Sequence, residues 1–169
     1  MMARVFRLTA IVAVTGFLGA SGLRAEDNDA AALETALKDI TATLQGGLKA
    51  SEPEGKPISA KFELEDGKLQ LSVYVLKGDD FVEVVADPKT AVAKSEKITD
   101  ADDLKAAAAQ KAAMAKATVS LLTAADTAAK ANTGLRAISI YPLLRDGHPV
   151  AEVTLLQGAA FKKVTEKLD

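Results

Sequence analysis

Apolar and polar residues alternate along two stretches of the chain, which begin at Ile58 and Ile138. A period of two residues is typical of a strand with one buried face. In the first stretch, Asp66 and Gly67 separate two alternating runs, and this pair suits a type I′ turn because both residues tolerate positive φ. A further turn leads to a third apolar run at 81–86. The pattern therefore predicts a hairpin followed by a third strand.

The second stretch repeats the first at a spacing of 80 residues, without a gap. Identical residues cover both the turns and the apolar positions of one phase: Ile58/Ile138, Ser59/Ser139, Leu64/Leu144, Asp66/Asp146, Gly67/Gly147, Val73/Val153, Leu76/Leu156, Gly78/Gly158, Phe81/Phe161 and Val84/Val164. A duplicated fold would retain these positions, so we predict a tandem repeat. Pro142 has no N–H, and its strand is therefore expected at a sheet edge or bulged at that residue.

Helical patterns precede both stretches. One apolar stripe predicts a single helix, which Gly46-Gly47 weaken or end: Leu33, Leu37, Ile40, Leu44 and Leu48. An alanine-rich run at 101–131 predicts a second helix, with Thr99 as its cap. This second helix either links the two repeats or bends between them.

These elements together predict an α+β fold of two tandem repeats. Each repeat would be an N-terminal helix packed on a three-stranded antiparallel sheet, because the apolar face of each sheet must be covered. We expect a first module at 26–98 and a second at 99–169, after a signal peptide at 1–25.

The first 25 residues have the order of a secretory signal peptide. Arg4 and Arg7 supply positive charge, residues 8–20 form an uncharged apolar run, and small residues lead to Ala25. We expect cleavage after Ala25, with Ala20 as the alternative. A membrane anchor is disfavoured because the run is shorter than the ~20 residues of a spanning helix. The mature protein is thus expected to be periplasmic or secreted, without stable membrane insertion.

Charge and cysteine content narrow the possible functions. Loss of residues 1–25 removes Arg4, Arg7 and Arg24 and no acidic residue, which changes the net charge from −2 to −5. A protein with this net negative charge has no overall electrostatic attraction to nucleic acid or anionic lipid. The chain has no cysteine, so disulfides, thiol catalysis and cysteine-based metal sites are excluded.

Few residues are candidates for a catalytic or metal-binding role. The one histidine, His148, follows the second Asp-Gly turn, and its counterpart in the first repeat is Lys68. Acidic residues gather at 63–66, 79–80 and 100–103, but without the spacing of a calcium-binding loop. We interpret them as turn, cap and surface residues. The sequence predicts no catalytic, metal-ligating or cofactor-binding residue, no cofactor and no enzymatic activity, and it identifies no binding residue.

Helix, three strands and a closing Asp-Pro-x-Thr turn at 87–90 together resemble the PepSY domain family of bacterial exported and membrane proteins. The Asp66-Gly67 hairpin and the strand at 81–85 also carry the resemblance. Ala91 stands where the family usually has glycine, and the second repeat reaches Asp169 without an equivalent closing turn. The resemblance implies a module that restrains peptidases or serves in sensing and interaction outside the membrane. It assigns no site residue to this chain.

We therefore expect a non-catalytic periplasmic interaction protein that binds a peptide or protein in the cell envelope, with restraint of a peptidase as one such role. A sheet edge can accept an extended peptide through backbone hydrogen bonds alone. The alternative is a sensor of a small ligand or cation in a cleft between the two modules. A hydrolase with an unrecognised serine or aspartate site is the weakest hypothesis.

Overall fold

Two long antiparallel hairpins are built on the two Asp-Gly pairs. Asp66 and Asp146 have φ values of 50° and 52°, and the glycines that follow them have φ values of 73° and 82°. Positive φ at both central residues is the geometry of the predicted type I′ turn. The strands of these hairpins are β1 (Lys56–Glu65), β2 (Lys68–Lys77), β5 (Arg136–Arg145) and β6 (His148–Gln157). Both predicted hairpins are confirmed.

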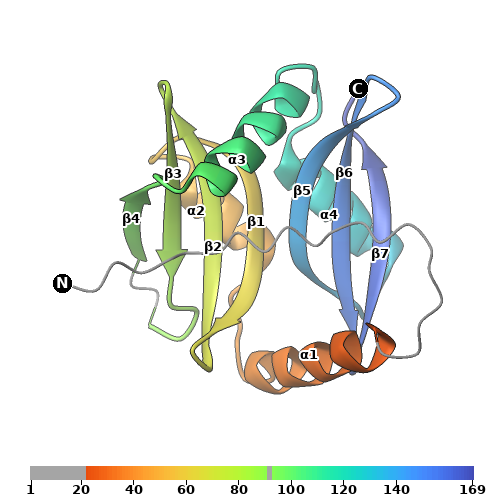
Figure 1. The fold of residues 1–169 in the computed structure, drawn as a ribbon. Helices are drawn as coiled ribbons and strands as arrows, with labels where there is room; N and C mark the ends of the chain where they lie inside the picture. The colour runs from red at the N-terminus through yellow and green to blue at the C-terminus, as the bar shows by residue number, and fades with distance from the viewer. Residues whose placement is uncertain (1–21, 91–92) are drawn as a thin grey trace.

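The computed structural model describes residues 22–90 and 93–169 (Figure 1). Residues 1–21 of the predicted signal peptide lie outside this range, and residues 22–25 belong to helix α1 (Gly22–Leu37). Among the described helices, none combines the length and the apolar character that a membrane span requires.

All seven strands of the described chain belong to one antiparallel sheet, in the order β4-β3-β2-β1-β5-β6-β7 (Figure 1). The outer strands are β3 (Asp80–Ala86), β4 (Ala93–Lys97) and β7 (Ala160–Lys167). The α+β class is confirmed. In place of two separate three-stranded sheets, β1 and β5 pair at the centre, which satisfies backbone groups that two separate edges would leave unpaired. The predicted module boundary after residue 98 falls between β4 and α3 (Ala101–Met114).

Pairing at the centre of the sheet includes one pair of residues that correspond at the 80-residue spacing. Ala60 pairs with Ile140, its counterpart, and Lys61 pairs with Ser139. The register also shifts at the same place in both hairpins, between Pro57 and Ser59 and between Ala137 and Ser139. The central pairing is therefore centred on one pair of corresponding residues, Ala60 and Ile140.

The prediction for Pro142 was wrong, because β5 is an interior strand and its irregularity lies at 137–139 rather than at the proline. Pro142 stays in register with Ala151 of β6. The pairs between β5 and β1 end at Ile140, so Pro142 lies beyond the ladder in which its missing N–H would be needed.

The predicted first helix is two helices. Helix α1 ends at Leu37, and α2 (Leu44–Ser51) starts after Thr43, whose Oγ1 accepts a hydrogen bond from Gly46 N (3.0 Å). All five residues of the predicted stripe are nevertheless buried in the core. Gly47 lies inside α2 instead of ending it. A Cβ at this position would come within 2.4 Å of Leu71 Cδ2, so glycine lets α2 approach β2 closely.

The alanine-rich helix is also divided, into α3 and α4 (Leu121–Ala131). Ser120 caps α4 by accepting a hydrogen bond from Thr123 N (3.1 Å), and Thr118 N and Val119 N donate to Leu168 O (2.7 and 3.0 Å). The cap of α3 is Asp100 rather than the predicted Thr99, since its carboxylate accepts from the N–H groups of residues 102 and 103. The bend carries the chain from one face of the sheet to the other.

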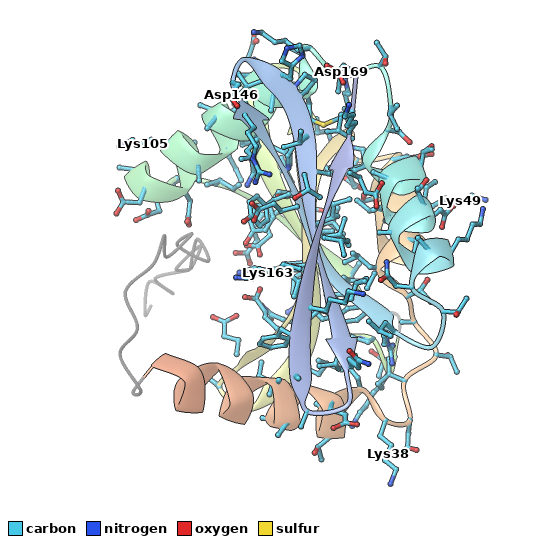
Figure 2. The ribbon with its side chains drawn as sticks, turned by 90° about the vertical axis from the view of Figure 1, so that its right-hand side faces the viewer. Lys38, Lys49, Lys105, Asp146, Lys163 and Asp169 are labelled. Carbon is cyan, nitrogen blue, oxygen red and sulfur yellow. The ribbon has the colours of Figure 1, made fainter. Side chains whose placement is uncertain are left out.

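The helices are divided between the two faces. Helices α2 and α4 cover one face and α3 covers part of the other, as the edge-on view makes clear (Figures 1 and 2). Helix α1 crosses the end of the sheet and contacts β7 and β2. Ala60 and Phe62 alternate with Ser59, which bonds to Gln110 of α3, so these apolar residues of β1 lie on the α2/α4 face.

Arg136, at the start of β5, connects the sheet to the α1–α2 connection through hydrogen bonds. Its guanidinium donates to Leu37 O (2.8 Å) and Ala42 O (2.5 Å) and lies 5.4 Å from the centre of the Phe62 ring. Partial burial lowers the pKa of this guanidinium, but the group remains charged at any physiological pH. Through these contacts the second hairpin orders the connection between two helices that belong to the first half of the chain.

Candidate functional site

The outer edge of β7 is one candidate binding surface. In the described residues no strand pairs with this side of β7, although β7 is eight residues long. Lys162, Lys163 and Lys167 are exposed along the strand, and Figure 2 shows Lys163 near the middle of it. The edge therefore offers backbone donors and acceptors next to positive charge.

Strand β3, which corresponds to β7 at the 80-residue spacing, shows how an additional strand fits beside it. Val82 to Ala86 pair with β4, from Lys97 back to Ala93. Ile98 N donates to Phe81 O (2.9 Å), so the backbone groups of residues 81, 83 and 85 face β4. Strands β6 and β7 have the same register as β2 and β3, shifted by 80 residues. By this correspondence, the backbone groups of residues 161, 163 and 165 face outward from β7.

The lysines affect which kind of strand can pair with this edge. Strand β7 carries three lysines, at 162, 163 and 167, against one acidic residue, Glu166, and edge charges discourage pairing between two copies of the same strand. An extended segment with acidic side chains opposite Lys162 and Lys163 would instead gain cross-strand attraction. The chemistry of the edge thus fits an acidic, extended partner.

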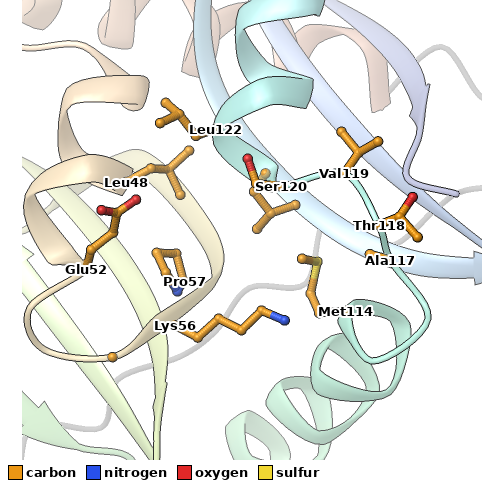
Figure 3. Close-up of a pocket in the computed structure, with 12 residues that line it drawn as sticks. Leu48, Glu52, Lys56, Pro57, Met114, Ala117, Thr118, Val119, Ser120 and Leu122 are labelled. Atoms are coloured by element: carbon orange, nitrogen blue, oxygen red, sulfur yellow. The ribbon is translucent and has the colours of Figure 1, made fainter.

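A pocket of about 400 Å³ is the second candidate. It lies between the end of α2, the start of β1 and the α3–α4 connection (Figure 3). Leu48, Met114 and Leu121 form an apolar wall, and the charged side chains of Glu52 and Lys56 are exposed at the pocket. Ligand pockets commonly have roughly 300–1,000 Å³, so this one is suited to a small molecule. Its walls come from both halves of the chain.

His148 is at the first position of β6, as expected from its place after the turn. Its Nδ1 lies 2.7 Å from Asp169 Oδ2, and both residues are exposed. The hydrogen bond from the imidazole is the main cause of the lowered pKa of Asp169. This pair links the second turn to the end of β7.

The acidic clusters are engaged in local contacts. Glu63 and Glu65 accept hydrogen bonds from Gln70 Nε2 (3.1 and 2.9 Å), and Asp80 pairs with Lys97 (2.6 Å). Asp100 caps α3. Within residues 22–90 and 93–169, no group of three or more acidic or histidine side chains is placed to hold a metal ion.

One buried carboxylate was not singled out from the sequence. Glu83 is only 5% exposed, and its Oε1 has no hydrogen-bond partner in the described part of the protein. Burial raises the pKa of Glu83, against the smaller opposing effects of hydrogen bonds from Ser72 and Tyr74. Burial also raises the pKa of the Tyr74 hydroxyl, and the nearby charges of Glu83, Glu63 and Asp103 raise it further. The group lies on the face that α3 covers, because Tyr74 and Glu83 are directly opposite each other and Ser59 is opposite Tyr74.

Neither candidate surface was located from the sequence. The pocket is formed by residues 48–57 and 114–122, which come together only when the two halves share one sheet. Comparisons of the chain with protein families, characterised proteins and solved structures found no match.

Proposed function

We propose that this chain is a non-catalytic interaction protein of the bacterial cell envelope, periplasmic or secreted, built from two copies of a PepSY-like module. In this proposal, it binds an extended segment of a peptide or protein partner as an additional antiparallel strand beside β7. A peptidase is one partner that the resemblance implies.

The observation that carries the proposal is the unequal pairing of two corresponding strands. On its outer side β3 pairs with β4, whereas the same side of β7 has no strand among the described residues. Added strands bind mainly through backbone hydrogen bonds, and neighbouring side chains supply specificity. The β3–β4 pair gives the register: a five-residue segment antiparallel to residues 162–166.

The side chains along β7 restrict the partner further. Residues 162 and 163 are lysines where β3 has Val82 and Glu83. A partner with glutamate or aspartate opposite these two lysines gains roughly 0.2–1 kcal/mol for each favourable pair. We therefore expect a partner segment that is extended and acidic.

A short synthetic peptide tests the binding mode directly. The probe is the segment 93–98, which includes the strand that occupies the corresponding place at β3, with both of its lysines replaced by glutamate. Hydrogen exchange of the purified protein is followed by NMR with and without this peptide. Binding beside β7 should slow exchange of the Lys163 and Thr165 amides, which face outward, and leave the Val164 amide nearly unchanged. Protection confined to β4, or none at all, would contradict the proposal.

Three variants distinguish the contribution of backbone hydrogen bonds to peptide binding from the contribution of the lysine charges. Lys163→Pro removes an outward N–H that β6 does not use, so peptide binding should be lost with little change in thermal stability. The double variant Lys162→Gln/Lys163→Gln should weaken binding severalfold without abolishing it. Lys105→Gln changes an exposed lysine on α3, far along the chain from β7, and should bind like the wild type.

The same comparison can be made in cells. A photo-cross-linking residue at position 165 should capture one defined partner in the envelope, and the same residue at position 105 should not. Capture must also be lost when Lys163→Pro is added. A partner that is captured equally from both positions would count against the β7 edge.

A further inference from the structure

The segment that pairs with β3 has one buried residue, at its end. All five residues of β4 are exposed. Ile98 directly follows β4, is 8% exposed and belongs to the hydrophobic core. Its N–H donates to Phe81 O (2.9 Å), so the ladder in which Val82 pairs with Lys97 continues by one step and places Ile98 opposite Phe81. The hydrocarbon that this segment buries is therefore concentrated at its last residue.

Ile98 and Phe81 lie on the face of the sheet that α3 covers. Phe81 is two residues before Glu83 on the same strand, so both side chains point to one face. Lys111 Nζ of α3 lies 6.0 Å from the centre of the Phe81 ring. Residues directly opposite each other on adjacent antiparallel strands have side chains close enough to pack. Ile98 therefore packs beside an aromatic ring, shortly before α3 begins.

Phe161 has the same place on β7 as Phe81 has on β3. It is directly opposite Leu156, as Phe81 is directly opposite Leu76, and both rings are partly buried and packed against the core. Helix α1 contacts β7 and passes the end at which this strand starts (Figure 1). In the described part of the chain no strand pairs with the outer side of Phe161, so this ring has no counterpart of Ile98.

We propose that the partner segment at β7 carries a large aliphatic residue directly opposite Phe161, where it packs on the ring. This inference rests on the proposed strand addition at β7 and specifies the partner further. Because the added strand is antiparallel, the aliphatic residue follows the residues opposite Lys163 and Lys162 in the partner sequence. With acidic residues at those two positions, the partner segment is acidic, acidic and aliphatic at its C-terminal end.

The aliphatic contact contributes more to affinity than either charge pair. Burial of a large aliphatic side chain is favourable in proportion to the area removed from water, whereas a pair of exposed charges is weakened by water and salt. Loss of the aliphatic residue should therefore weaken binding by about tenfold. Loss of one acidic residue should weaken it by about two- to threefold.

Three end-blocked peptides of equal length test this position. The first is the segment 93–98 with both lysines replaced by glutamate, which keeps Ile98. The second also carries Ala93→Ile and Ile98→Ala, so it has the same composition with the isoleucine at the other end. The third is the first peptide with Ile98→Leu. In calorimetric titrations of the purified protein, the second peptide should bind about tenfold more weakly than the first, and the third within about twofold of it.

Variants of the protein locate the contact. Phe161→Ala should remove the preference, so that the first and second peptides bind equally, whereas Phe161→Leu keeps an apolar side chain and should preserve it. Phe81→Ala is the matched control: it truncates the corresponding ring of β3, and the preference at β7 should remain about tenfold. Thermal unfolding checks that each variant is folded. If Phe161→Ala does not fold, the comparison of the peptides on the wild-type protein still tests the proposal.

Equal binding of the first two peptides to the wild-type protein would overturn the proposal, and so would a tenfold preference that persists in folded Phe161→Ala. In either case, protection of the Lys163 and Thr165 amides by the first peptide would still support strand addition at β7. Absence of that protection with every peptide would instead count against the β7 edge itself. Failure of the aliphatic contact and failure of the proposed function are therefore separate results.

Discussion

The two faces of the central sheet are both covered by helices, but the covered surfaces differ in chemistry. On the α2/α4 face, strand residues such as Ala60, Val73 and Leu155 are apolar and buried. On the α3 face, Ser59, Tyr74 and Glu83 are buried instead. The α2/α4 side of the sheet thus buries hydrocarbon, whereas the α3 side buries several polar groups beside apolar residues such as Val150 and Leu156.

This difference affects how much each helical layer contributes to the free energy of unfolding. Burial of hydrocarbon is favourable without any directional requirement. Buried polar groups need partners, and an unpartnered oxygen such as Glu83 Oε1 costs free energy. Helix α3 buries Asp103, Ala107, Ala113 and Met114, and of these only Met114 has a large apolar side chain, so the helix buries little apolar area of its own. We expect the α2/α4 layer to dominate stability and α3 to open more readily.

The largest expected effect is at Leu44 on α2, which is fully buried. Leu44→Ala should lower the free energy of unfolding by about 2–5 kcal/mol, because it removes buried hydrocarbon and leaves a cavity. Leu104→Ala on α3 is the matched control, since Leu104 is 36% exposed, and it should change stability by no more than about 0.5 kcal/mol. Denaturant unfolding measures both. Equal losses would mean that the two helical layers contribute alike.

A smaller effect is expected at the contact between α3 and the sheet. The Ser59 hydroxyl donates to Gln110 Oε1 (2.8 Å), and Ser59 is 5% exposed. Gln110→Ala should cost about 1–2 kcal/mol by leaving this hydroxyl without its acceptor. Ser59→Ala combined with Gln110→Ala should recover part of that loss, because both partners are then removed. Hydrogen exchange should speed up in α3 and not in α2; uniform acceleration would argue against independent opening of α3.

The smallest effect is a dependence on pH at Glu83. Its pKa is raised by burial, so the folded state favours the protonated carboxyl. The stabilisation from protonation is present below the ordinary carboxyl pKa and is lost as pH rises through the raised value. Glu83→Gln, which stays neutral, should therefore raise Tm at pH 7, and the gain should disappear as the pH is lowered through the carboxyl range. A gain that is independent of pH would exclude the buried charge as its cause.

The sequence predicted the local elements because their signals are local. The Asp66-Gly67 and Asp146-Gly147 pairs specify type I′ turns through positive φ, and alternation assigned the strands on either side. The apolar stripe from Leu33 to Leu48 correctly predicted burial, but it did not reveal the break between α1 and α2. Periodicity reports which residues face the core, and two helices can satisfy the same periodicity as one.

Both candidate surfaces depended on the arrangement of the two halves. The central β1–β5 pairing determines which sheet edges remain outside, and it brings residues 48–57 next to residues 114–122. Contacts between residues so far apart in the chain have no local pattern that alternation or spacing could detect. The PepSY resemblance, which stays a prediction, concerned a single module and did not extend to how two such modules would pack on each other.

By itself, the sequence determined the α+β class, both hairpins, the 80-residue internal similarity and most of the buried positions. These follow from dihedral preferences and from the period of apolar residues, which act within one element. Only the tertiary structure decided that the halves share one sheet, that β4 pairs with β3 while β7 has a free outer edge among the described residues, and that α3 covers a polar face. Such choices depend on which edges and faces can satisfy each other's hydrogen bonds and apolar area, a property of the assembled elements and not of any one of them.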